Sequence, residues 1–192
     1  MNRQLNISRN RRMAGARGLA PTGMAGRRGQ AAVELALAVP LLLLFAFSII
    51  EFGNMLNDVQ EAIDLTRQGA SMASRGESVA NSATAVVTGS APLNLSQDGE
   101  VIVTEITDSS GGSPKISDQA TSGGKTFTSK VGTGVGATAN VPTSIQSVLS
   151  ASAGTTVYTT EVYFDYTPVT PIGSLFKWSQ TMPKTIYEIA YF

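Results

Sequence analysis

The sequence contains neither cysteine nor histidine among its 192 residues. Without cysteine there is no disulfide framework, thiolate zinc site, redox pair or lipid-modified cysteine anchor. Without histidine there is no histidine-based catalytic triad, HExxH zinc site or histidine general base. Charged residues make up only 15% of the chain, and we recognise no motif of a catalytic nucleophile with its base. The sequence therefore predicts a protein that is not an enzyme and has no cofactor or metal.

Charge is distributed unevenly along the chain. Lysine and arginine together number 14, as do aspartate and glutamate, so the formal net charge is zero. Residues 1–28 hold seven arginines and no acid, so the rest of the chain carries seven basic and fourteen acidic residues. Because no basic patch recurs after residue 28, nucleic acid is not an expected partner. We interpret residues 1–28 as a basic leader without regular structure, in which Met13 and Met24 are alternative starts.

A long uncharged run dominates the first third of the sequence. It extends from Leu35 to Ile50, and continuing it to Leu56 gives a helix of about 33 Å, enough to cross a hydrocarbon core of about 30 Å. Arginines precede this run, and the next charged residues after it are acidic. The positive-inside rule then predicts a single-pass protein with a cytoplasmic N-terminus and residues 57–192 across the membrane.

The helical pattern continues beyond this run. Apolar and small residues recur every three or four positions from Phe52 to Ala73, and Gly76 has the position of a C-cap. We therefore predict one helix over residues 31–75, with a mild kink at Pro40. Glu51 is predicted to be an interfacial acid, near enough to the far membrane surface to reach water.

The remaining sequence is typical of a small α+β domain. Alternating apolar residues and turn signals predict a sheet of about four antiparallel strands, packed on the long helix or on a short one. The predicted elements are a helix at 78–87, strands at 93–96 and 100–107 joined by a hairpin turn at 97–99, a flexible Gly/Ser-rich loop over 108–140 with one strand at 126–131, a helix at 142–152, and strands at 155–166 and 185–192.

The carboxylate of Glu34 lies at the start of the apolar run, where a charge is unfavourable unless another group neutralises it. Placing a charged residue at the middle of a membrane helix raises the free energy of insertion by about 2.5–3.5 kcal/mol, and by less near the membrane surface. If the chain were cut after Gly29, Gln30 would carry a free α-amine four residues before Glu34. That amine, in the same chain or a neighbouring one, could pair with Glu34 and neutralise both groups in apolar surroundings.

Residues 27–35, Arg-Arg-Gly-Gln-Ala-Ala-Val-Glu-Leu, resemble the prepilin processing motif of Flp-type pilins. The longer run over 27–56 resembles the start of the TadE-like minor pilins, or pseudopilins, of the tight-adherence pilus system, and residues 162–168 and 171–175 resemble a strand and turn near the end of such proteins. The resemblance implies a structural pilus component of the bacterial inner membrane, cleaved by a prepilin peptidase between Gly29 and Gln30. Its implied partners are other pilins or pseudopilins, the inner-membrane assembly platform and membrane lipid, with Glu34 as the assembly charge.

These predictions divide the chain into four parts. They are a cleaved leader at 1–29, a transmembrane helix at 30–56, a projecting continuation at 57–76 and a periplasmic domain at 77–192. Two alternatives remain open. One is an uncleaved single-pass envelope protein whose periplasmic domain binds a partner, and the other is a Sec signal peptide with a poor cleavage site near residues 46–48. The first residue of the mature protein distinguishes the pilin-like reading, which predicts Gln30, from the uncleaved anchor.

Overall fold

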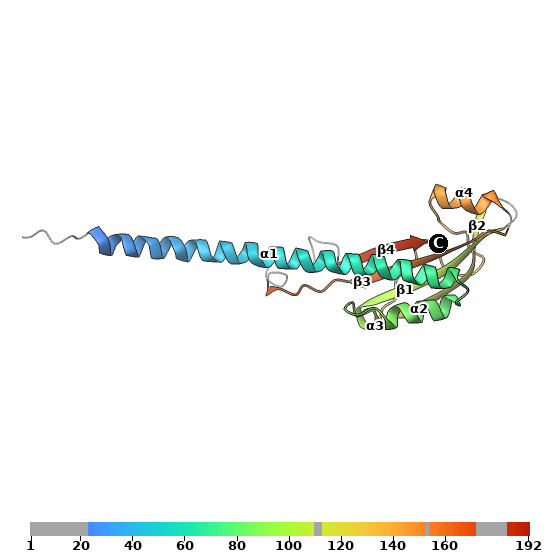
Figure 1. The fold of residues 1–192 in the computed structure, drawn as a ribbon, viewed down its shortest axis with the longest axis horizontal. Helices are drawn as coiled ribbons and strands as arrows, with labels where there is room; N and C mark the ends of the chain where they lie inside the picture. Colours follow the sequence, from blue (N-terminus) through green and yellow to red (C-terminus); the bar gives the residue numbers. More distant parts are fainter. Residues whose placement is uncertain (1–22, 110–112, 153, 172–183) are drawn as a thin grey trace, which may run out of the picture. The chain divides into compact units, whose positions relative to one another are not determined.

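The computed structural model describes residues 23–109, 113–152, 154–171 and 184–192. Contacts divide the chain into two units, Met1–Leu43 and Leu44–Phe192. The elements, labelled in Figure 1, are α1 (Gly23–Ser74), α2 (Val79–Thr88), α3 (Leu95–Asp98), β1 (Gly99–Ser109), β2 (Ser113–Gly123), α4 (Thr143–Ala151), β3 (Thr156–Asp165) and β4 (Thr185–Tyr191). A long apolar helix followed by a small antiparallel sheet confirms the predicted α+β class.

Helix α1 begins earlier than the sequence pattern predicted. It starts at Gly23 rather than near residue 31, so the prediction of an irregular leader is wrong for residues 23–28, and residues 1–22 lie outside the described part. Alanine, methionine and arginine are good helix formers, and extending an existing helix costs far less than nucleating one. The C-terminal prediction is confirmed: α1 ends at Ser74, and Gly76 has a positive φ of 97° and donates its N–H to Ala73.

In the first unit, the side chains of α1 described from residue 29 onward are exposed. The helix includes an 18-residue stretch that is apolar and long enough to cross a membrane, and none of that stretch is buried. Pro40 lies inside the helix, and the predicted kink there stays a prediction.

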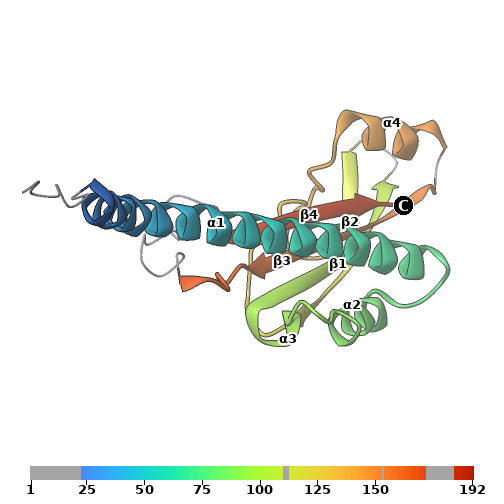
Figure 2. The same cartoon turned by 60° about the vertical axis from the view of Figure 1, so that its left-hand side comes forward.

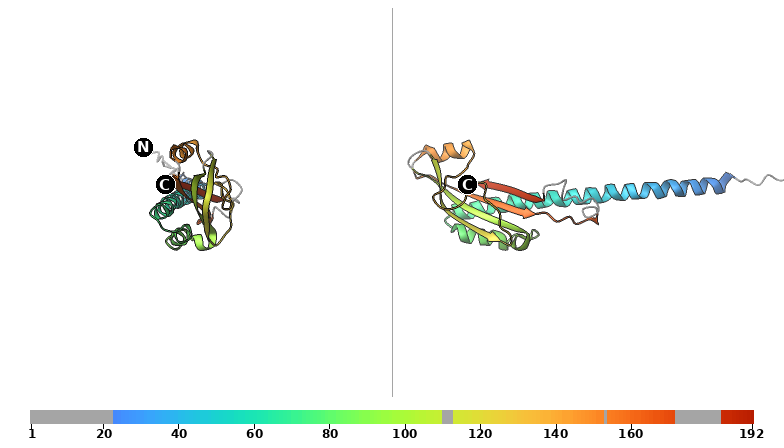
Figure 3. Two further views of the ribbon diagram at one scale, coloured as in Figure 1. Left: turned by 90° about the vertical axis from the view of Figure 1, so that its right-hand side faces the viewer. Right: turned by 180° about the vertical axis from the view of Figure 1, so that it is seen from behind.

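The second unit is built around one sheet with the strand order β2-β1-β3-β4, in which every neighbouring pair is antiparallel. One face, which we call the inner face, carries Val101, Val103, Val162, Phe164 and Ile186. Helix α2 and the later part of α1 pack on it, with Ala62, Leu65 and Ala73 of α1 buried in the same cluster. Figures 2 and 3 show these two helices on one side of the strands.

The opposite face, the outer face, has a second apolar cluster and a covering segment. Leu149 of α4 packs there with Ile106, Ile116 and Val157. The strand predicted at residues 126–131 is wrong, because these residues form no strand. The covering segment, residues 125–131, runs over Glu100, Glu161 and Tyr163, and the ring of Phe127 stacks on Tyr163 at 5.0 Å.

Two other local predictions are wrong. The proposed strand at 93–96 is replaced by the short helix α3, and the partner of β1 is β2, which lies within the predicted loop at 108–140. Strand β2 contains Pro114, serines and a terminal glycine, residues of low strand propensity that an edge strand tolerates. The helices predicted at 78–87 and 142–152 and the last two strands are confirmed within two residues at each end.

Candidate functional site

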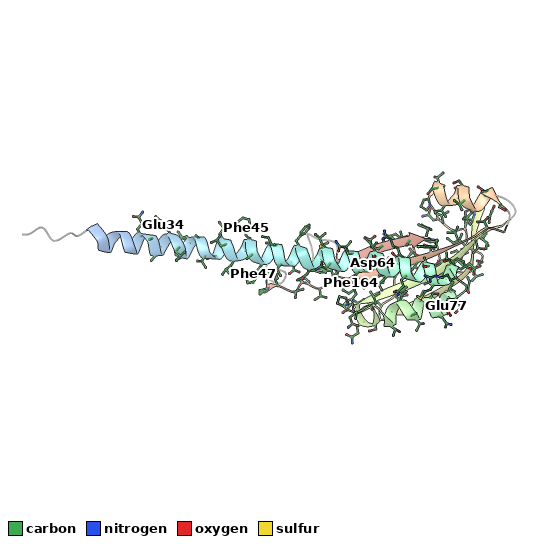
Figure 4. The ribbon with its side chains drawn as sticks, viewed as in Figure 1. Glu34, Phe45, Phe47, Asp64, Glu77 and Phe164 are labelled. Atoms are coloured by element: carbon green, nitrogen blue, oxygen red, sulfur yellow. The ribbon has the colours of Figure 1, made fainter. Side chains whose placement is uncertain are left out.

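Three of the residues expected to act during processing and assembly lie together on α1. The side-chain amide of Gln30 donates a hydrogen bond to the Glu34 carboxylate at 3.0 Å, because a spacing of four residues places both on one helix face. A Cβ atom added at Gly29 would meet nothing within 4 Å. Figure 4 labels Glu34 on this part of the helix. The structure thus brings Gln30 and Glu34 into contact, while their roles in processing and assembly stay predictions.

The part of α1 that follows carries a large exposed apolar surface. Leu37 is 74% exposed and Ile49 is 73% exposed, although buried positions are where such side chains usually occur. Large apolar side chains are exposed along the whole stretch: Val33, Leu35, Leu37, Val39, Leu41, Leu42, Leu43, Leu44, Phe45, Ile49 and Ile50. An apolar patch of this size indicates a surface that meets lipid or another protein.

Glu51 ends this apolar stretch, and the structure corrects what we expected of it. Glu51 is only 2% exposed, so the prediction that its carboxylate reaches water is wrong. One carboxylate oxygen accepts hydrogen bonds from the Tyr166 hydroxyl at 2.5 Å and the Val169 N–H at 3.2 Å. The other accepts from the Thr170 N–H at 2.9 Å and the Thr170 hydroxyl at 2.6 Å. We call Glu51, Tyr166, Val169 and Thr170 the Glu51 clasp.

The clasp holds a carboxylate with neutral donors alone. None of the ion pairs found among the described residues involves Glu51. Burial, together with the hydrogen bond to Glu51, raises the pKa of the Tyr166 phenol well above its usual value, so the hydroxyl keeps its proton and remains a donor. Multiple hydrogen bonds to an ionised carboxylate are among the stronger ones in proteins. The clasp therefore fixes the chain after β3 firmly against α1.

Sequence reasoning reached Glu51 and Tyr166 of the clasp without connecting them, and it did not single out Val169 or Thr170. Glu51 lies in the run 27–56 and Tyr166 in the run 162–168, which resemble the same family, but the two residues are 115 positions apart. No periodicity or spacing links residues at that distance, so only the folded chain shows the contact.

Two further carboxylates are buried on the outer face, and neither forms a metal site. Glu161 is fully buried and accepts hydrogen bonds from the Ser129 hydroxyl, the Lys130 N–H at 2.8 Å and the Tyr187 hydroxyl at 3.0 Å. Glu100 accepts from the Phe127 N–H. These bonds hold the covering segment on the sheet. Among the described residues no group of three or more acidic residues could hold a metal ion.

Comparison with known proteins finds one similarity. Residues 29–71 match the model of a family described as TadE-like protein. The match includes every residue singled out on the helix, Gly29, Gln30, Glu34, Pro40 and Glu51. It confirms the resemblance near the start of the chain, while residues 162–168 and 171–175 lie outside the match. No curated protein and no solved structure gives a significant match.

Proposed function

From the premise that residues 29–71 are TadE-like, we propose that this chain is a minor pilin or pseudopilin of a tight-adherence pilus. Similarity to this family implies a pilin-like structural component associated with such a pilus. One long apolar helix near the N-terminus fits a single-pass membrane anchor. The proposal adds the location and orientation: the bacterial inner membrane, with the N-terminus in the cytoplasm and the sheet domain in the periplasm.

One observation carries this proposal. The family match coincides with a helix on which most apolar side chains between Val33 and Ile50 are exposed. Before assembly, such a surface anchors the protein in the lipid bilayer. After assembly, it packs against the corresponding helices of neighbouring subunits. Small residues on it allow close approach of neighbouring helices: Ala31, Ala32, Ala36 and Ala38. The partners would be other pilins or pseudopilins and the membrane assembly platform.

Processing is proposed to occur between Gly29 and Gln30, by a prepilin peptidase. The hydrogen bond from Gln30 to Glu34 shows that groups on residue 30 lie within reach of the carboxylate. Cleavage would create an α-amine at Gln30, one helical turn from Glu34 or opposite the Glu34 of a neighbouring subunit. The positive amine would then neutralise the carboxylate in the apolar surroundings of a membrane or filament.

The test is to determine the N-terminal residue of protein extracted from membranes, by mass spectrometry. We expect Gln30 in the wild type and an N-terminus before residue 29 in Gly29→Lys. Since a Cβ atom added at Gly29 would meet nothing within 4 Å, we expect the lysine to leave the helix and the domain intact. An uncut wild-type chain would contradict processing at this junction.

A second candidate is the uncleaved single-pass envelope protein. One feature favours it: α1 runs without interruption through the Gly29–Gln30 bond, so the backbone there is engaged in helical hydrogen bonds rather than open to a peptidase. This candidate predicts one N-terminus, upstream of residue 29, for both the wild type and Gly29→Lys.

A further inference from the structure

We propose that the Glu51 clasp marks the periplasmic edge of the hydrocarbon layer and thereby sets the position of α1 along the membrane normal. This inference rests on the membrane anchoring proposed above. The clasp would lie at the level of the lipid headgroups. This position also shortens the span that the sequence predicted, from residues 30–56 to residues 31–50.

The first argument comes from the backbone of the clasp. Residues 166–170 form neither helix nor strand, and Thr167 and Val169 are exposed. Irregular backbone does not face lipid within the hydrocarbon region, because any N–H or C=O group without a partner in the protein would have no water to bind. Since this segment lies directly on Glu51, the helix at residue 51 is outside the hydrocarbon layer.

The second argument comes from charge and packing. The Glu51 carboxylate has no cationic partner among the described residues, and an unpaired charge in hydrocarbon is costly. Just beyond it, Met55 and Val59 pack against the core cluster on the inner face of the sheet. These side chains contact the folded domain, so the helix after Glu51 belongs to that domain.

The third argument is a count. Ala31 to Ile50 is a stretch of 20 residues, and a helix of that length spans about 30 Å, the thickness of the hydrocarbon core. With Ile50 at the outer edge, the Gly29–Gln30 bond falls at the cytoplasmic surface. Glu34 then lies about one helical turn, roughly 5 Å, inside the hydrocarbon. If the clasp fixes the periplasmic edge at Glu51, Glu34 is held inside the hydrocarbon near the cytoplasmic surface. The charge of Glu34 then has to be neutralised.

Labelling of single cysteines tests this position directly, because the native chain has no cysteine. Three exposed positions on α1 are replaced one at a time in the full chain: Leu42→Cys, Leu56→Cys and Gln60→Cys. Spheroplasts carrying each variant are treated with a membrane-impermeant maleimide. All three variants keep the clasp, so the result does not depend on a protein that fails to fold.

We expect Leu56→Cys to react nearly as much as Gln60→Cys, while Leu42→Cys reacts at most about a tenth as much because lipid covers it. Protection of both Leu42→Cys and Leu56→Cys would place the edge beyond residue 56 and overturn the inference, while leaving the membrane anchor intact. Equal reaction at all three positions would show that there is no anchor, which contradicts the proposed function itself.

Removing the clasp should shift the helix. Glu51→Leu eliminates the acceptor and extends the apolar stretch, so we expect labelling at Leu56→Cys to fall severalfold as residues 52–56 enter the lipid. Glu61→Leu is the matched control, since it adds the same side chain on the same helix away from the clasp, and labelling should not change. Unchanged labelling in Glu51→Leu, with the protein still in the membrane, would show that the clasp does not set the position.

Discussion

At the scale of single residues, the two glutamates that bracket the apolar run have opposite surroundings. Glu34 is exposed on the helix and contacts Gln30, whereas Glu51 is buried beneath residues 166–170. In the sequence they look alike, because each is an isolated acid beside leucines, isoleucines or valines. The burial of Glu51 is decided by a segment more than a hundred positions away. Local sequence therefore predicted where these carboxylates lie along the helix and could not predict what surrounds the second one.

The clasp can be tested by removing one hydroxyl. Thr170→Val keeps the shape of the side chain and removes the O–H that bonds to Glu51 at 2.6 Å. We expect the free energy of unfolding of the sheet domain to fall by about 1–2 kcal/mol, since a hydrogen bond to a charged group is lost. Urea unfolding in detergent measures this. Thr167→Val, at an exposed neighbouring position, is the control and should change little; equal effects would contradict a specific role for the Thr170 hydroxyl.

At the scale of elements, α1 is held on the sheet by close packing as well as by the clasp. A Cβ atom at Gly69 would lie 2.8 Å from the Thr160 hydroxyl and 3.1 Å from a methyl group of Val86. Glycine here lets α1 approach both β3 and α2. The apolar stripe in the sequence predicted that this part of α1 is helical and has a buried face. It could not show that residue 69 is a point of close approach, because that depends on strand positions fixed only in the fold.

Two matched glycine substitutions separate packing from helix propensity. Gly69→Ala should lower the free energy of unfolding by about 1–3 kcal/mol, because the added methyl group overpacks the contact with Thr160. Gly53→Ala lies on the same helix with nothing within 4 Å of the added Cβ, and it should raise stability by about 0.5–1 kcal/mol through helix propensity. Thermal unfolding compares the two variants. A stabilised Gly69→Ala protein would contradict the close contact of α1 with β3.

The end of β3 is joined to the covering segment by an ion pair with a definite pH dependence. Burial alone would raise the pKa of Asp165, but hydrogen bonds from the Lys125 ammonium at 2.8 Å and the Thr185 hydroxyl outweigh it and hold that pKa below its usual value of 3.8. A group with a lowered pKa stabilises the fold above its unfolded pKa, and this contribution is lost as the pH falls through the folded value.

Asp165→Asn should therefore destabilise the protein at neutral pH, by about 1 kcal/mol because the pair is partly exposed. The difference from wild type should persist down to about pH 4 and shrink below it, as wild-type Asp165 takes up a proton. Urea unfolding at a series of pH values measures this, with the exposed Asp118→Asn as control. A difference that grows on acidification would contradict the lowered pKa.

At the scale of the whole chain, sequence reasoning was most successful where structure is local. The apolar period predicted the long helix, and the alternating strands β3 and β4 were recognisable by themselves. Strand β2 was missed because its own residues favour turns, and it is a strand only because β1 provides a partner. The same limit applies to function: the proposed processing junction lies within nine consecutive residues that resemble a known motif, whereas the clasp has no local signature.

The two glutamates also make different predictions for the assembled protein. Because Glu34 is exposed, contacts Gln30 and belongs to the first unit, whereas the sheet belongs to the second, Glu34→Gln should leave the unfolding free energy of the sheet domain unchanged. If Glu34 neutralises a neighbour's α-amine, the variant should be present in the membrane and cleaved, yet surface pili should be few or absent, since one charge of a buried pair is left alone at a cost of about 3–5 kcal/mol.

Glu51→Gln should behave differently, because the Glu51 side chain is buried in the clasp. An amide has one acceptor oxygen where the carboxylate has two, so one backbone N–H in the clasp loses its acceptor and one hydroxyl has to accept a hydrogen bond from the amide instead of donating one. We expect a less stable sheet domain and a lower protein level in the membrane, with the number of pili reduced in proportion to the protein level.

Immunoblots of the membrane fraction and counts of surface pili, made on both Glu34→Gln and Glu51→Gln, separate the two effects. Normal piliation in Glu34→Gln would contradict charge pairing and favour the uncleaved anchor, whereas loss of pili at full protein level in Glu51→Gln would mean that this carboxylate also acts in assembly.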